Sequence, residues 1–192
     1  HFFTHRAGTV NGLTTPRLWT PPARKLTPVT SHGPAVAAFA ESLGIQVFPW
    51  QRWALLHGLE LDRSGQYRFK VVLVVVARQN GKTTIVQVLS LWLMTAVARL
   101  LALGTSTNLE TARESWMAAV DLAEVEMPRD VASVKRGAID TSLRLHNGSR
   151  YKVAAANRRG GRGLAVDLGL ADELREHTSW DAWGALSGAT TA

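Results

Sequence analysis

The chain has 192 residues, of which 46% are hydrophobic and 19% charged, and its formal net charge is +7. This composition is typical of a folded domain and excludes a disordered chain. The absence of cysteine excludes disulfides and cysteine-ligated zinc, and it favours an intracellular protein. No apolar run reaches the roughly 18 residues of a membrane span. The positive charge favours a polyanionic partner, nucleic acid first.

The first 34 residues carry five of the seven prolines and are predicted to form an extended arm ahead of a domain over residues 35–192. A short helix is predicted over residues 35–42. A second helix opens at Pro49 and runs to about residue 61, because proline suits the first helical position.

Residues 68–76 are almost continuously β-branched near their end, which predicts a strand buried on both faces of a parallel sheet. A loop and a helix over residues 82–98 follow. The next predicted elements are a strand over residues 99–103 and a helix over residues 107–126 that Asn108 caps.

The following region is predicted to contain a β-hairpin. Short β-like pieces over residues 142–145 and 150–153 flank His146-Asn147-Gly148-Ser149, and Asn-Gly is a strong hairpin signal. A buried strand over residues 164–171 and a helix over residues 180–186 complete the chain. Alternating strands and helices predict an α/β domain of three layers with a mainly parallel central sheet and a β-hairpin insertion.

The loop between the first predicted strand and its helix has the character of a phosphate-binding loop. Backbone N–H groups of such a loop, together with the positive end of the helix, bind phosphate oxygens. Lys82 is expected to reach the β- and γ-phosphates, and Thr83 to place its hydroxyl on Mg²⁺. Gly81 permits close approach of the backbone. The loop reads Ala77-Arg78-Gln79-Asn80-Gly81-Lys82-Thr83-Thr84, and Arg78 to Thr84 are the predicted phosphate contacts.

The loop departs from the general pattern G-x-x-x-x-G-K-[ST] at its first position, where this chain has Val76. Arg78 inside the loop is also unusual. Its guanidinium could lie against the γ-phosphate, or it could form a surface ion pair.

A pair of carboxylates follows the last predicted strand. Asp172 is expected to hold Mg²⁺, and Glu173 to orient and polarise the attacking water. Glu176 is the alternative for the catalytic role. Asp167 is a flaw in a fully buried strand, and we expect it near the start of the strand, at an edge.

Three arginines lie in a glycine-rich loop just before that strand. Arg158, Arg159 and Arg162 could act as a finger on the transferring phosphate, contact a nucleic-acid backbone, or form a solvated basic loop. Arg162 is the preferred finger because it is closest to the strand.

Gln51 is the candidate for binding the base. Its side chain carries a donor and an acceptor side by side, which suits an edge of adenine. Trp50 or Trp53 could stack on the base or pack the domain.

Taken together, these motifs resemble those of the ATPase domain of the large terminase subunit of tailed bacteriophages, the DNA-packaging motor. The phosphate loop with an internal arginine is the most specific match, because the resemblance makes the missing glycine at position 76 an expected trait. The other matching pieces are Pro49-Trp50-Gln51, Thr105-Ser106-Thr107, Arg162-Gly163 and Leu170-Ala171-Asp172-Glu173.

The resemblance implies a P-loop fold of the catalytic-glutamate class with an additional strand between the phosphate-loop strand and the Asp172 strand. It implies Mg²⁺-dependent ATP hydrolysis that drives double-stranded DNA into a procapsid in the host cytoplasm, without a membrane. The implied partners are the portal protein, the small terminase subunit and further copies in a ring, commonly of five subunits. Arg162 would then act in trans on a neighbour's ATP.

Two features of the family have no counterpart here: the coupling motif that follows the Asp-Glu pair, and the C-terminal nuclease domain. We therefore expect a fragment that is monomeric in isolation and weak or inactive in hydrolysis. The alternatives are another P-loop ATPase, such as a helicase or a AAA-like remodelling protein, and a nucleotide-binding assembly module without turnover.

Overall fold

The structure is a computed structural model that describes residues 13–77, 79–106, 109–137, 140–154, 165–172 and Thr190. The chain divides into two compact units, residues 1–75 and 76–192, and each is described by itself. Among the described residues, no helix is both long and apolar enough to cross a membrane.

The first unit contains two helices that pack together, α1 (Gly33–Ser42) and α2 (Pro49–Gly58). Both carry proline in the first turn, where its missing N–H costs nothing. Gly33 makes the contact possible. A Cβ at this position would lie 2.4 Å from the backbone nitrogen and Cα of Leu56. Both predicted helices are therefore present, and α2 ends earlier than expected.

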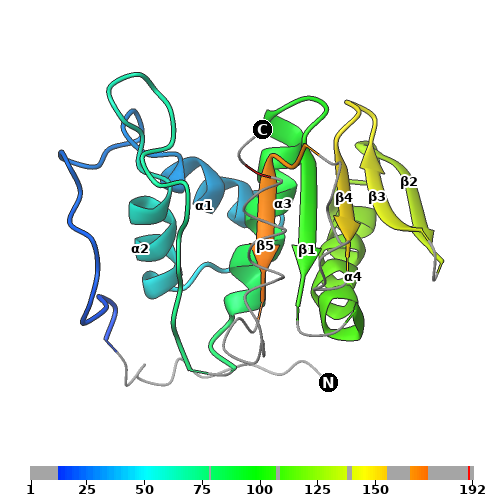
Figure 1. Ribbon diagram of the computed structural model, residues 1–192, viewed down its shortest axis with the longest axis horizontal. Helices are drawn as coiled ribbons and strands as arrows, with labels where there is room; N and C mark the ends of the chain where they lie inside the picture. The colour runs from blue at the N-terminus through cyan, green and yellow to red at the C-terminus, as the bar shows by residue number, and fades with distance from the viewer. Residues whose placement is uncertain are drawn as a thin grey trace. The chain divides into compact units, whose positions relative to one another are not determined.

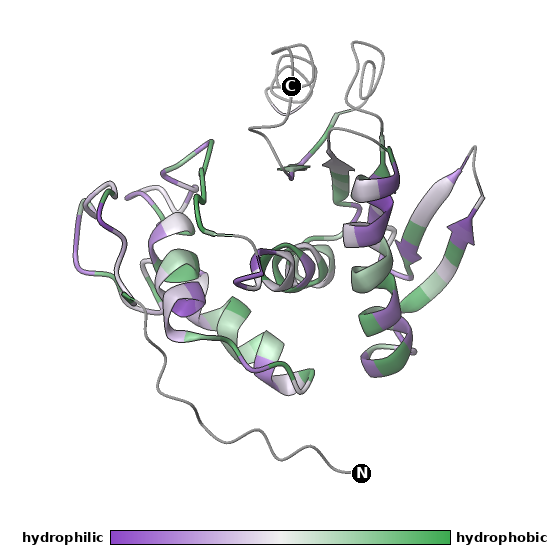
Figure 2. Ribbon diagram, turned by 90° about the horizontal axis from the view of Figure 1, so that it is seen from below, coloured by the Kyte–Doolittle hydropathy of each residue, from purple (hydrophilic) through white to green (hydrophobic). Residues whose placement is uncertain are grey.

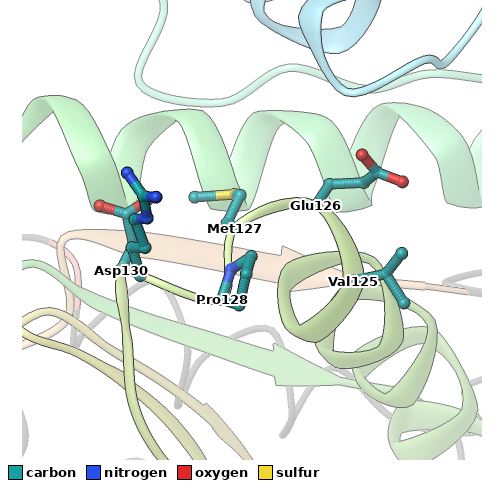
Figure 3. Close-up of a pocket in the computed structure, with 6 residues that line it drawn as sticks. Val125, Glu126, Met127, Pro128 and Asp130 are labelled. Atoms are coloured by element: carbon teal, nitrogen blue, oxygen red, sulfur yellow. The ribbon is translucent and has the colours of Figure 1, made fainter.

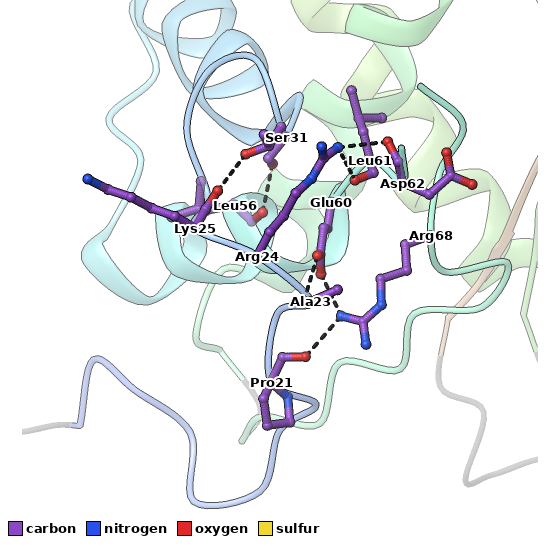
Figure 4. Close-up of polar contacts among 11 residues, drawn as sticks. Pro21, Ala23, Arg24, Lys25, Ser31, Leu56, Glu60, Leu61, Asp62 and Arg68 are labelled. Carbon is purple, nitrogen blue, oxygen red and sulfur yellow. Dashed lines mark hydrogen bonds and ion pairs between the residues drawn. The ribbon is translucent and has the colours of Figure 1, made fainter. Parts of the chain in front are cut away.

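The described part of the predicted arm contains no helix or strand before Gly33, yet it is anchored to the rest of its unit. Figure 4 shows the anchor around Glu60, whose side chain is 1% exposed. Its carboxylate accepts hydrogen bonds from the Ala23 backbone N–H (2.8 Å) and from Arg68 Nη1 (2.7 Å). Arg24 donates to the carbonyls of Leu61 and Asp62, both at 2.7 Å. The segment therefore packs against residues 60–68 even though it is irregular.

The apolar run 71–76 corrects the sequence prediction of a buried strand over residues 68–76. The backbone of this run forms no strand, and Leu73 and Val75 are 70% and 81% exposed. A run rich in β-branched residues favours extended backbone, but a strand also needs a neighbour to which it can hydrogen-bond. Within the described residues no strand pairs with this run.

The second unit is built on a five-stranded sheet with the order β2-β3-β4-β1-β5. The central strand β1 pairs in parallel with β4 on one side and β5 on the other. The pairs β2–β3 and β3–β4 are antiparallel. This arrangement confirms the α/β class, the parallel core and the hairpin at Asn147-Gly148. The strands are β1 (Leu101–Thr105), β2 (Val131–Arg136), β3 (Thr141–Leu145), β4 (Arg150–Val153) and β5 (Leu168–Ala171).

Two helices, α3 (Lys82–Ala96) and α4 (Leu109–Glu126), pack against each other and on the same face of the sheet (Figures 1 and 2). The buried positions of α4 recur at helical spacing and face the sheet. Trp116 is fully buried there and donates its indole N–H to the carbonyl of Tyr151 in β4 (3.1 Å). The predicted helix over residues 180–186 lies outside the described residues.

Strands β1, β2 and β5 differ most from the predictions. Strand β2 was not expected as a separate element, and β1 begins two residues later than predicted. Strand β5 begins at Leu168 instead of residue 164, and Asp167 lies just before it. The Asp167 carboxylate accepts a hydrogen bond from the Leu101 N–H (2.7 Å), so it lies at the start of the strand, as expected of a charged residue.

Candidate functional site

The loop ahead of α3 has a backbone suited to binding an anion. Gln79 and Gly81 both have positive φ, at 61° and 79°, and α3 begins directly afterwards at Lys82. Alternation of left-handed and right-handed conformations turns successive N–H groups toward one side. The first N–H groups of a helix have no partner within the helix. Asn80 stiffens the loop by donating to the carbonyl of Ala77 (3.4 Å).

A second group of polar side chains gathers where β1 and β5 end. The Asp172 N–H donates to the carbonyl of Thr105 (3.0 Å), which extends the pairing of the two strands by one residue. Ser115, on α4, donates its hydroxyl to Asp172 Oδ2 at 3.4 Å. The Ser106 hydroxyl donates to the carbonyl of Asp172 at 3.4 Å. The carboxylate of Asp172 is thus held on the face of the sheet that α4 covers.

The hydroxyl of Thr105 is the one polar side-chain atom among the described residues that is buried without a hydrogen-bond partner. Thr105 is 7% exposed and ends β1 beside Asp172. A buried hydroxyl without a partner costs about 1–3 kcal/mol, which water or a ligand would offset. Neither Thr105 nor Ser115 had an assigned role from sequence. The run Thr105-Ser106-Thr107 after a predicted strand was the only signal for Thr105, and Ser115 had none.

The loop and the strand ends lie at the same edge of the sheet. Residues 97–100 connect the end of α3 to the start of β1, and the helix packs back along the strand. The start of α3 therefore lies near the ends of the parallel strands β1 and β5, as Figure 1 shows. This places Lys82 and Thr83 at the same edge as Asp172. Ligands of α/β proteins commonly bind at this edge.

The donor set fits Mg²⁺ better than a metal held in a protein cage. Mg²⁺ is usually bound through one or two carboxylates, together with waters and substrate phosphates. Asp172 offers such a carboxylate, and the hydroxyl of Thr83 would be a further oxygen ligand. Within the described ranges, no group of three or more His, Asp or Glu side chains could hold a metal by itself.

Tyr151 in β4 forms part of the surroundings of Asp172. The side chain is 1% exposed, and its hydroxyl lies 3.1 Å from the position a Cβ would take on Gly104. Burial, and secondarily the negative charge of Asp172, raise the pKa of Tyr151 far above its ordinary value. The absence of a side chain at Gly104 therefore lets the strand pack closely on the tyrosine, because a Cβ there would push against its ring and hydroxyl.

Gln51 is fully buried in the first unit, where its side chain makes a hydrogen bond at the start of α2. Its Oε1 accepts a hydrogen bond from the Phe48 N–H (2.7 Å) and so caps the start of α2. Trp53 stacks on His57, with 3.8 Å between the ring centroids, and Trp19 meets both rings edge-on. The assignment of Gln51 to adenine stays a prediction.

Several predicted site residues lie outside the described residues, and their roles remain predictions. They are Arg78 in the loop, the arginines Arg158, Arg159 and Arg162, and the carboxylates Glu173 and Glu176.

A hollow at the end of α4 is a poor candidate for the site. It is lined by one continuous stretch, residues 125–130, and Figure 3 shows Glu126 and Asp130 at its rim. None of the predicted site residues lies in it.

Comparisons with known proteins give a structural likeness only. No family model matches the chain, and no curated protein matches it in sequence. Among solved structures, it is similar to the large terminase ATPase domain of Thermus phage P74-26, with 18% identity and a TM-score of 0.58. An arginine-to-alanine variant of that domain gives 16% identity and the same TM-score. The match covers 80% of this chain and 64% of the phage domain. The chain thus has a mixed α/β fold like that of this phage domain.

Proposed function

We propose that this chain binds ATP and Mg²⁺ at the carboxyl edge of its sheet and hydrolyses ATP as the motor domain of a phage terminase large subunit. The proposal rests mainly on one observation: the loop before α3 and the carboxylate after β5 lie at the same carboxyl edge of the sheet. A loop with positive-φ Gln79 and Gly81 opens α3, and Asp172 ends the neighbouring strand β5. The similarity in fold to a phage terminase ATPase domain supports the same function.

The proposed roles follow from the chemistry of phosphoryl transfer, in which positioning and electrostatic stabilisation supply most of the catalysis. The N–H groups ahead of α3 and the ammonium of Lys82 bind the phosphates. Thr83 and Asp172 hold Mg²⁺, which supplies positive charge against the phosphate oxygens when bound. Glu173 orients the attacking water, and Arg162 of a neighbouring copy stabilises charge on the transferring phosphate.

The proposed setting is the DNA-packaging motor acting on a procapsid in the host cytoplasm. Double-stranded DNA, the portal protein, the small terminase subunit and further copies of the chain in a ring are the proposed partners. The net charge of +7 supports a polyanionic substrate.

A nucleotide-binding module without turnover is the second candidate, favoured by one observation. The apolar run ahead of the phosphate loop is exposed and forms no strand. The loop is therefore held less rigidly than catalysis requires.

Turnover separates the two candidates. Within the full-length protein we expect the domain to release phosphate from ATP in the presence of Mg²⁺ and DNA, and Glu173→Gln to lower that rate at least ~100-fold while leaving ATP binding within ~3-fold. The matched control is Glu114→Gln, an exposed carboxylate on α4, which is expected to leave turnover unchanged. ATP binding without turnover in the wild-type chain would favour the module instead.

A further inference from the structure

The antiparallel part of the sheet has two chemically different faces. In β2, β3 and β4, residues that pair across strands point to the same face. Val134, Leu143 and Tyr151 pair with one another and form the face toward α4, where Leu143 is fully buried. Arg136 lies on this face too and bonds to Glu124 of α4 (2.5 Å).

The opposite face carries four basic side chains. The register pairs Ser133 with Arg144 and Arg144 with Arg150, and in the next row it pairs Lys135 with Ser142 and Ser142 with Lys152. We call this surface the basic face and define it by its cations, Lys135, Arg144, Arg150 and Lys152. Lys135 and Arg144 are exposed, and Arg150 and Lys152 are half-buried.

Few acidic side chains lie near the basic face among the described residues. The three strands contain no Asp or Glu, and the nearest acids in sequence are Asp130 and Asp140, one before each of the first two strands. Lys135 bonds to Asp140 at 2.9 Å. The hydrogen bond from Lys135 lowers the pKa of Asp140, and the positive charge of Lys152 adds to this effect. The strand register places both lysines on the same face. Four cations against this one contacting carboxylate leave the basic face positive.

We propose that the basic face binds the phosphate backbone of double-stranded DNA. Three strands at a spacing of about 4.8 Å give a patch roughly 10 Å across. A duplex carries one negative charge per about 1.7 Å of its length, so several phosphates lie opposite a patch of that size. The strand register holds the cations in fixed rows, and the exposed Ser133, which pairs with Arg144, adds a short hydrogen-bond donor. Such contacts position a duplex without reading its sequence.

The proposal deepens the proposed function and rests on it for the choice of DNA as the polyanion. The surface is formed at the end of the sheet remote from β5, as Figure 1 shows, and so it is distinct from the edge at which Asp172 lies. Substitutions on the basic face are therefore expected to weaken DNA binding without affecting nucleotide binding.

The test is binding of a labelled DNA duplex of mixed sequence by fluorescence anisotropy across a salt series, with Arg144→Glu/Lys152→Glu. We expect at least a ~10-fold loss of affinity near 0.1 M salt and a fall of about two units in the slope of log affinity against log salt. The milder Arg144→Gln/Lys152→Gln is expected to lose affinity in the same direction. The matched control is Arg63→Glu, an exposed arginine in the first unit, with a change below ~3-fold.

Binding of a fluorescent ATP analogue with Mg²⁺, measured in parallel, separates the two proposals. The double variants are expected to keep wild-type nucleotide affinity, which also reports that they are folded. If the wild-type chain did not bind the nucleotide, that result would contradict the proposed function but not the proposed DNA contact. If both double variants kept the wild-type affinity for the duplex and the wild-type salt slope, the proposal that the basic face binds DNA would be overturned. An equal loss of duplex affinity in Arg63→Glu would overturn it too. Binding of polyglutamate as tightly as the duplex would point to an acidic protein partner and would also overturn it.

Discussion

Two runs of this chain that are rich in apolar residues have opposite surroundings. Strand β1 (Leu101–Thr105) is buried along its whole length, whereas residues 71–75 are all exposed. Each edge of β1 has a hydrogen-bonded neighbour, and α4 packs on one face. The exposed run has no strand neighbour among the described residues. Burial of an apolar run therefore depends on partners elsewhere in the chain as much as on its own residues.

The largest expected effect is on the free energy of unfolding, and it comes from substituting one leucine in each of the two runs. Leu103→Ala in β1 should lower the free energy of unfolding by about 2–5 kcal/mol, because Leu103 is 2% exposed and the substitution leaves a cavity. Leu73→Ala should change it by less than ~0.5 kcal/mol, because that side chain is 70% exposed. Chemical denaturation of both variants measures the difference. Equal losses would show that residues 71–75 are buried in solution.

A smaller effect is expected from the segment just ahead of the exposed run. Glu60→Gln should cost about 1–3 kcal/mol, because its new amide group would face the Ala23 N–H or Arg68, both of which are donors. Arg63→Ala, at an exposed neighbouring position, should cost less than ~0.5 kcal/mol. If Glu60→Gln were as mild as Arg63→Ala in denaturant titrations, the buried carboxylate would not be what holds this segment.

The smallest effect concerns the tyrosine that packs on β1. Burial raises the pKa of Tyr151 above its ordinary value of 10.0, so the folded state keeps a proton that the unfolded state releases at high pH. The stabilising contribution is full below pH 10.0 and is lost as pH rises further. The free energy of unfolding should thus fall by up to ~1.4 kcal/mol per pH unit from this group. Tyr151→Phe should reduce that slope, and an unchanged slope in the variant would contradict the assignment.

The elements that sequence predicted best were those with local signals. Proline at the first turn located α2, and Asn147-Gly148 located the hairpin between β3 and β4. The end of β5 at Ala171 and the start of α3 at Lys82 also agree with the predictions. These signals act within a few residues of the chain and need no knowledge of the sheet.

The elements that sequence missed depend on distant partners. Strand β2 is largely exposed and has no alternating apolar pattern, and it forms because β3 offers it a neighbour. In the candidate site, Ser115 contacts Asp172 although 57 residues separate them. A lone serine on a helix gives no signal of that contact.

The most direct test of the central claim is Mg²⁺-dependent binding of ATP by the chain and by Lys82→Ala, measured by titration calorimetry. The account predicts binding that weakens at least ~10-fold in Lys82→Ala and on removal of Mg²⁺, because both cations face the phosphates. Lys70→Ala, an exposed lysine outside the loop, should bind as the wild type does. Equal ATP affinity in the wild-type chain and in Lys82→Ala would contradict the claim.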